Sequence, residues 1–88
     1  AAAVLYRALS TAQQAYAGGE RRADALRRSM AETLQDEPLA RTQYVSVADP
    51  ETLAELQGEV GRALLSMAVF VGKTRLIDNV IVGDPQTN

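Results

Sequence analysis

The sequence contains no cysteine and no histidine. Without cysteine the chain can form neither a disulfide nor a thiolate nucleophile, and cysteine usage gives no information about the redox compartment. Without histidine it cannot supply a Ser-His-Asp triad, a histidine acid–base catalyst or a zinc site with histidine ligands. These common forms of nucleophilic and zinc chemistry are therefore excluded from this chain.

Aromatic residues, excess charge and long apolar runs are also scarce. Tyr6, Tyr16, Tyr44 and Phe70 are the only aromatic residues, and they are too few and too scattered for a platform on which nucleic-acid bases stack. Nine basic and eleven acidic side chains give a net charge of −2, which argues against nucleic acid and against a polybasic membrane contact. The apolar runs are too short to span a bilayer, and the start lacks the basic region of a signal peptide. We therefore expect neither a nucleic-acid nor a membrane partner.

The first part of the chain has the periodicity of two helices. Its 88 residues, 47% of them hydrophobic, suffice for a single small domain over residues 1–88. Apolar residues at helical spacing predict one helix over residues 1–17, ended by Gly18-Gly19, and a second over residues 20–36, ended by Pro38. The short connection makes the two helices antiparallel neighbours. Because no capping residue precedes the alanine-rich start, we expect that the chain was cut from something longer.

The second part has the composition of strands. Residue types and alternation predict strands over residues 42–48, 62–71 and 74–82. Asp49-Pro50 predicts the start of a short helix over residues 50–57. We expect an α+β fold in which a helical hairpin packs on a three-stranded antiparallel sheet, in the order α-α-β-(short α)-β-β. The polar tail, residues 83–88, is expected to be frayed.

Acidic residues are frequent around the predicted short helix. Asp49, Glu51, Glu55 and Glu59 have two readings, a metal or acid–base cluster and a capped, solvated helix face. We favour the second, because Asp49 is a good N-cap and acidic residues suit the first turn of a helix.

The predicted strand over residues 62–71 is apolar on both faces. Alternation places Leu64, Ser66, Ala68 and Phe70 on one face, and two helices can cover only the other. We expect the short helix and a protein partner to cover Phe70 and Leu64, so that the isolated chain tends to self-associate.

The tripeptide Gly72-Lys73-Thr74 matches the end of a nucleotide-binding P-loop. The complete pattern needs a glycine five positions before Gly72 and a helix after the threonine. Met67 stands where that glycine is needed, and the residues after Thr74 are β-formers. We reject the P-loop and predict a tight turn between two strands, with Gly72 able to take positive φ.

The same region nevertheless carries a resemblance to a known family. Val71-Gly72-Lys73-Thr74-Arg75-Leu76-Ile77-Asp78-Asn79 resembles the C-terminal signature of the pantothenate synthetase (pantoate–β-alanine ligase) family, in which an apolar strand leads into Gly-x-Thr-Arg-Leu-Ile-Asp-Asn. Tyr44-Val45-Ser46-Val47-Ala48-Asp49 is similar to the family's Tyr-Val-x-x-x-Asp segment, and residues 1–37 are similar to its alanine-rich helical pair, with the turn Ala17-Gly18-Gly19-Glu20. Phe70 departs from the family, where a polar or basic residue is often expected.

The resemblance implies a function for a longer protein. That family joins pantoate to β-alanine with ATP and Mg²⁺ through a pantoyl-adenylate, in the cytoplasm, on the pathway to coenzyme A. Its His-x-Gly-His and Ser-Ser-Arg-Asn motifs lie in an N-terminal nucleotide-binding domain and are absent here. The resemblance therefore implies a C-terminal lid domain over the active site, with no catalytic residue, metal or bound cofactor of its own and the N-terminal domain as its partner. A free-standing interaction or dimerisation module, which would form a homo-oligomer, is the alternative from another class.

The signature residues themselves are Gly72, Thr74, Arg75, Asp78 and Asn79. Arg75 and Asp78 are three apart on a strand, so they are predicted to lie on opposite faces and not to pair. We expect Asp78, in mid-strand among apolar residues, to accept hydrogen bonds that support the fold. Contacts of Lys73 or Arg75 with nucleotide phosphates are the less favoured reading, since basic side chains at turns are usually solvated.

Overall fold

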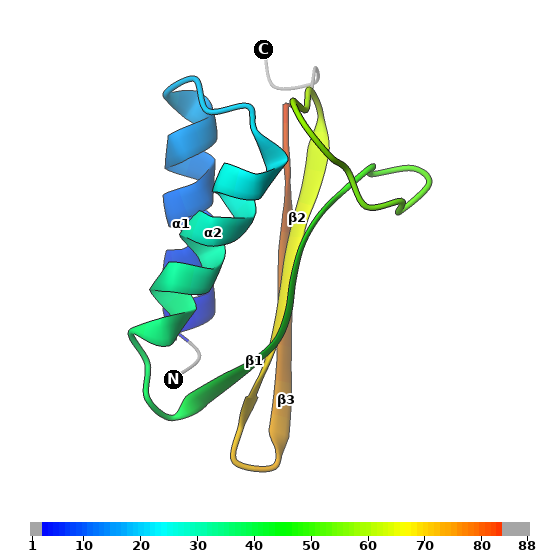
Figure 1. Cartoon of the computed structure of the whole chain (residues 1–88). Coiled ribbons are helices and arrows are strands. Elements are labelled where there is room, and N and C mark those ends of the chain that lie inside the picture. The colour runs from blue at the N-terminus through cyan, green and yellow to red at the C-terminus, as the bar shows by residue number, and fades with distance from the viewer. Residues whose placement is uncertain (1–2, 84–88) are drawn as a thin grey trace.

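The computed structural model describes residues 3–83 and has two layers, a pair of helices and a sheet (Figure 1). The elements are α1 (Ala3–Ala17), α2 (Ala23–Gln35), β1 (Ala40–Ala48), β2 (Ala63–Val71) and β3 (Thr74–Val82). The strands pair antiparallel in the order β1-β2-β3. The α+β class, the helical hairpin and the antiparallel sheet were all predicted correctly from the sequence. No helix within residues 3–83 has the length and apolar character needed to cross a membrane.

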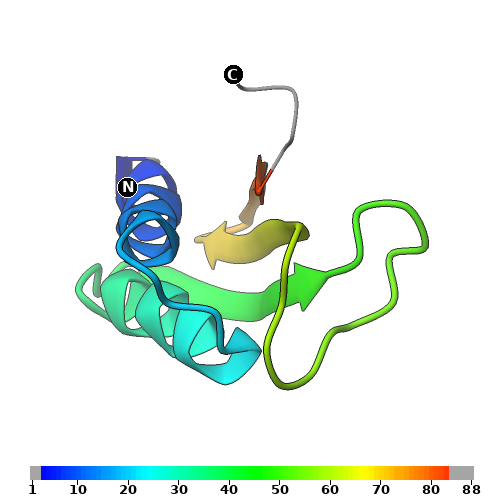
Figure 2. The ribbon, with the colours of Figure 1, turned by 90° about the horizontal axis from the view of Figure 1, so that it is seen from above.

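Both helices lie on one face of the sheet, as a view along the sheet shows (Figure 2). The core forms between them, since Leu26, Met30 and Leu34 of α2 are completely buried together with Leu65 and Met67 of β2. These α2 residues recur at helical spacing, whereas the β2 residues alternate. The predicted second helix and the predicted covering of one face of the middle strand by the two helices are confirmed.

A two-residue turn joins β2 to β3. Val71 and Thr74 are the last paired residues, and Gly72 between them has a φ of 62°. Glycine with positive φ at the first central position is the signature of a type II′ hairpin turn. Gly72-Lys73-Thr74 is therefore a strand connection, and the rejection of a P-loop is confirmed.

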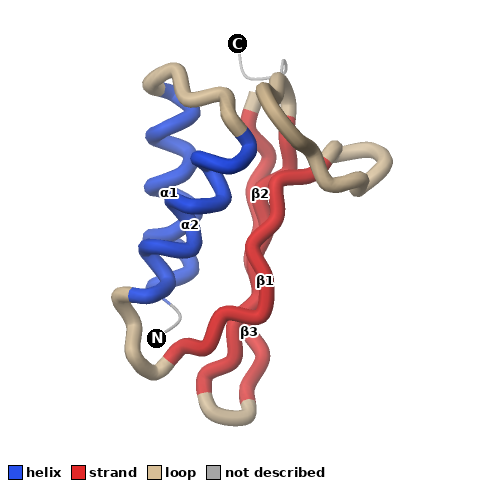
Figure 3. Tube along the Cα trace, in the orientation of Figure 1, coloured by secondary structure: helices blue, strands red, loops and turns tan. Residues whose placement is uncertain are grey.

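The predicted short helix over residues 50–57 is wrong, because the chain makes only one turn there. Asp49 caps that turn as expected, its Oδ1 accepting hydrogen bonds from the backbone N–H groups of Glu51 and Thr52. The chain then reverses at Leu53, whose φ is 65°, and cannot continue as a right-handed helix. Ala54 O accepts from the N–H of Asp49, and the N–H of Leu56 donates to Val47 O. Residues 49–62 form an extended loop beside β1 (Figure 3).

Of the tail expected to be frayed, residues 83–88, only Gly83 falls within the described residues. Gly83 has a φ of 76° and lies against the backbone of Gly61 and Arg62 and the hydroxyl of Tyr16. Gly83 therefore follows β3 at an exposed bend beside the loop that precedes β2.

Candidate functional interface

Among residues 3–83, no second layer covers the face of the sheet turned away from the helices (Figure 2). Directly paired residues of an antiparallel sheet share a face, so the register groups this face into four rows. We call it the open face. Its rows are Ala48-Leu64-Ile81, Ser46-Ser66-Asn79, Tyr44-Ala68-Ile77 and Arg41-Phe70-Arg75.

Residues of three of these rows and of the neighbouring loop line a groove of mixed polar and apolar character. Ile77, 52% exposed, and Leu53 of the loop, 66% exposed, both line the groove, and Ile81, 40% exposed, lies on the same face of the sheet. The groove has a volume of about 510 Å³, and Ser46, Ser66 and Asn79 contribute polar groups to its lining. Ala68 is nevertheless buried, because its row neighbours are larger. The predicted division of β2 into a core face and a second, less covered face is confirmed.

The fourth row carries the positive charge of the open face. The Arg41 guanidinium lies 5.3 Å from the centre of the Phe70 ring, and Arg75 Nε donates to Gln43 Oε1 at 2.7 Å. Lys73 is exposed at the adjoining turn. None of these three cations is ion-paired with another residue of the described range. The structure thus brings together Lys73 and Arg75, which the sequence singled out, with Arg41, which it did not.

Arg41 was missed because a bulge in β1 sets its position. The register shifts between Thr42 and Tyr44, leaving Gln43 as an extra residue. Simple alternation along β1 places Arg41 and Tyr44 on opposite faces, whereas the bulge puts both on the open face. A bulge of this kind has no clear signature in a single sequence. Residue spacing alone therefore does not predict that Arg41 lies beside Phe70 and Arg75 on the open face.

Asp78 was expected to accept hydrogen bonds that support the fold, and it does accept one from a backbone N–H, but from an exposed position. The register confirms that Arg75 and Asp78 lie on opposite faces, since Arg75 pairs with Phe70 and Asp78 with Met67. Asp78 is exposed, however, and its Oδ1 accepts a hydrogen bond from the N–H of Asn79 at 2.8 Å. β3 is an edge strand, so solvent reaches its side chains even on the helix side. Asp78 is therefore a solvent-facing residue of an edge strand and is not part of the core.

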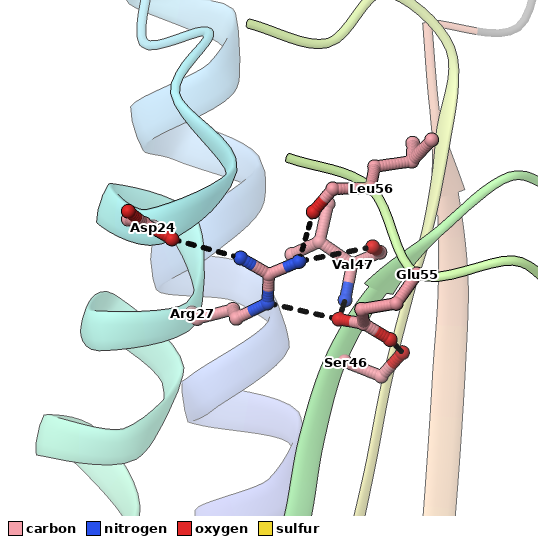
Figure 4. Close-up of polar contacts among 6 residues, drawn as sticks. All are labelled: Asp24, Arg27, Ser46, Val47, Glu55 and Leu56. Carbon is pink, nitrogen blue, oxygen red and sulfur yellow. Dashed lines mark hydrogen bonds and ion pairs between the residues drawn. The ribbon is translucent and has the colours of Figure 1, made fainter. Parts of the chain in front are cut away.

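A polar cluster fixes the loop at residues 49–62 to α2 and β1 (Figure 4). Arg27 Nε donates to Glu55 Oε2 at 2.8 Å, and its Nη atoms donate to Asp24, to Val47 O and to the carbonyl oxygen of Leu56. Glu55 in turn accepts from the Ser46 hydroxyl at 2.6 Å and the Val47 N–H at 2.9 Å. The cluster thereby holds the wall of the groove in place.

The electrostatics of this cluster follow from its hydrogen bonds. Burial raises the pKa of the Glu55 carboxyl, but the bonds from Ser46, Val47 and Arg27 outweigh burial and the pKa is lowered overall. The backbone N–H groups of Thr52 and Glu51 likewise lower the pKa of Asp49. Across residues 3–83 no three acidic side chains gather where they could hold a metal ion. Asp49 caps a turn and Glu55 attaches the loop to α2 and β1, and capping is the role that the sequence favoured for Asp49.

Replacing Arg27 by alanine is expected to lower the free energy of unfolding by about 2–3 kcal/mol, because a charged donor with several partners is lost. Its side chain is only 18% exposed, so water cannot replace these bonds fully. Urea denaturation measures the change. The matched control is Arg28→Ala on the exposed neighbouring position, which should change stability by less than about 0.5 kcal/mol. Equal effects of the two substitutions would contradict the role of the cluster.

Comparisons with known proteins identify the family of the chain. The sequence model of the Pantoate-beta-alanine ligase family matches residues 1–81. Pantothenate synthetase of Herpetosiphon aurantiacus is 55% identical over 93% of this chain and 30% of its own length, and that of Chloroflexus aurantiacus (strain J-10-fl) is 60% identical over 90% of this chain and 28% of its own length. A crystal structure of pantothenate synthetase from Thermus thermophilus matches 88% of this chain and 28% of that chain, with 34% identity and a TM-score of 0.78.

Within residues 3–83 the chain is an α+β domain whose sheet is covered by helices on one face only. The chain belongs to the pantoate–β-alanine ligase family. It spans about 30% of the length of the curated relatives that it matches, which fits the C-terminal domain implied by its signature.

Proposed function

We propose that the chain is the C-terminal lid domain of an ATP-dependent ligase that condenses pantoate with β-alanine to give pantothenate in the cytoplasm. The proposed reaction proceeds through a pantoyl-adenylate, with ATP and Mg²⁺ held by the rest of the enzyme. The described residues offer no acidic cluster that fits Mg²⁺, so this domain is not assigned the metal. The domain itself closes over the reactants and excludes water from the acyl-adenylate.

The open face is the observation that carries this proposal. Its exposed apolar side chains, Tyr44, Ile77 and Ile81, together with Leu53 of the adjoining loop, resemble the covered part of an interface more than a solvated surface. Burying one large apolar side chain is worth about 1.5–3 kcal/mol relative to leaving it in water. The part of the enzyme that lies outside this chain supplies the cover. A second copy of the chain is the alternative occupant, and it is the one expected of a free-standing module.

The direct test compares the isolated chain with the full-length enzyme that contains it. The full-length enzyme should form pantothenate from pantoate, β-alanine and MgATP, whereas the isolated chain should form none above background. The physical reason is that the chain has no histidine and no phosphate-binding glycine loop. Pantothenate formation by the isolated chain would contradict the assignment of catalysis to the rest of the enzyme. A full-length enzyme without this activity would contradict the proposed reaction.

A further inference from the structure

The geometry points to a polyphosphate-binding site at the hairpin end of the open face, formed by Arg41, Lys73 and Arg75. This inference rests on the proposed function and deepens it, since it assigns to the domain a direct contact with the triphosphate of the nucleotide or with the pyrophosphate that leaves. The lid then recognises the charged substrate as well as covering it.

The two arginines are held in place with donors left over. Arg75 uses Nε for Gln43 Oε1, so its two Nη groups keep their N–H donors for another ligand. Arg41 lies over the Phe70 ring, and a guanidinium in contact with a ring face still presents the donors at its edge. Guanidinium groups bind phosphate through paired N–H donors, which makes arginine the side chain best suited to this ligand.

The spacing favours an extended anion over a single carboxylate. Arg41 and Arg75 both pair with Phe70 of the middle strand, so their backbones lie two strand spacings apart, or about 10 Å. Lys73 is exposed at the turn two residues before Arg75. Positive charges gathered in this way repel one another, and none of them has an acidic partner among residues 3–83. A multivalent anion that contacts all three relieves that repulsion.

The position within the domain agrees with this ligand. α1 begins toward the same end of the molecule as the turn between β2 and β3 (Figure 1). In the proposed enzyme the nucleotide-binding part precedes this domain, and the chain enters α1 at the end where the row Arg41-Phe70-Arg75 lies. The other three rows of the open face carry apolar residues and the uncharged polar residues Ser46, Ser66 and Asn79, so the cations of this face all lie in the fourth row.

The test uses the full-length enzyme and measures binding as well as turnover. Arg41→Gln and Arg75→Gln, singly and combined, are compared with the parent enzyme by calorimetric titration of ATP, pyrophosphate and AMP. We expect the double variant to bind ATP at least tenfold more weakly, and the KM for ATP to rise in parallel, while the KM values for pantoate and β-alanine change less than twofold. Arg75→Lys should restore part of the lost affinity, because it keeps the charge but not the paired donors.

The titrations distinguish the two sources of the anion. Weaker binding of both ATP and pyrophosphate, with AMP unchanged, places the contact on the phosphates that leave. Weaker binding of ATP alone places it on the triphosphate of the substrate. Arg28→Gln and Arg62→Gln remove the same charge elsewhere on the domain and serve as controls.

Two outcomes overturn the inference. One is an unchanged affinity for ATP and pyrophosphate in the double variant, and the other is an equal loss in the control variants. In both cases an enzyme that still makes pantothenate shows that the proposed function stands without this site. If the parent enzyme makes no pantothenate, the result contradicts the proposed function itself. Melting temperatures of all variants, measured beside the parent, separate lost binding from lost folding, since all four arginines are at least partly exposed.

Discussion

Leu65→Ala is expected to destabilise the isolated domain by about 2–5 kcal/mol, the largest effect on folding of any substitution considered for this chain. Leu65 is completely buried in the central strand, within the core that β2 forms with the two helices. A domain of this length has a total stability of about 4–13 kcal/mol. At the lower end of that range the variant is mostly unfolded in water. Urea denaturation followed by circular dichroism gives both values.

The control is Ile77→Ala, a truncation of similar size on the open face. Ile77 is 52% exposed, so its loss should cost less than about 1 kcal/mol, the span of strand preferences at such positions. Similar losses from Leu65→Ala and Ile77→Ala would mean that the open face is covered in the isolated chain. In that case stability should rise with protein concentration, as the self-association expected from the sequence requires. A stability independent of concentration, together with a small loss from Ile77→Ala, agrees with an open face in the free domain.

The fold could be predicted from the sequence where one local signal governs each element. Local sequence was sufficient to predict three features: the alanine-rich first helix, the second helix with its buried Leu26, Met30 and Leu34, and the glycine turn at Gly72. These signals are periodicity, helix propensity and a residue that tolerates positive φ. They fixed the order of the helices and strands without information from distant parts of the chain.

The errors arose where distant contacts decide the structure. Asp49-Pro50 is a good start for a helix, but the N–H of Leu56 instead bonds to Val47 O, and Arg27 holds Glu55 from the other layer. Those tertiary bonds outweigh the local preference of a short segment, which cannot form a stable helix alone. The exposed position of Asp78 was missed for a related reason. Its neighbours in sequence are apolar, but its exposure depends on β3 being an edge strand, which strand order alone determines.

The cationic row, Arg41-Phe70-Arg75 with Lys73 at the adjoining turn, could be predicted from the sequence only in part. Lys73 and Arg75 are close in sequence and could be singled out, whereas Arg41 lies far earlier in the chain and reaches the same row through strand pairing and a bulge. Positive charge and residue type are properties of the sequence, but convergence on one face is a property of the register.

Ile77→Asp in the full-length enzyme is expected to lower kcat/KM about a hundredfold, the largest effect on activity that the lid proposal predicts. The physical reason is that a misplacement of about 1 Å far from the reacting atoms can cost that factor. A carboxylate in the middle of the open face must be desolvated when that face is covered, which is costly without a partner. The exposure of Ile77 in the free domain means that the substitution leaves the domain folded, and its melting temperature checks this.

The same variant should also lose the coupling between ATP use and product formation. A lid that closes poorly admits water, and water hydrolyses an acyl-adenylate that would otherwise await the amine. More than one AMP should therefore be released for each pantothenate formed, and coupled assays of both products measure that ratio. Tyr6→Asp is the matched control, because Tyr6 is also an exposed large side chain, 72% accessible, but lies on α1 in the other layer. If Tyr6→Asp uncouples the enzyme as strongly as Ile77→Asp, then the helical layer shares in closure and the open face is not the inner surface of the lid.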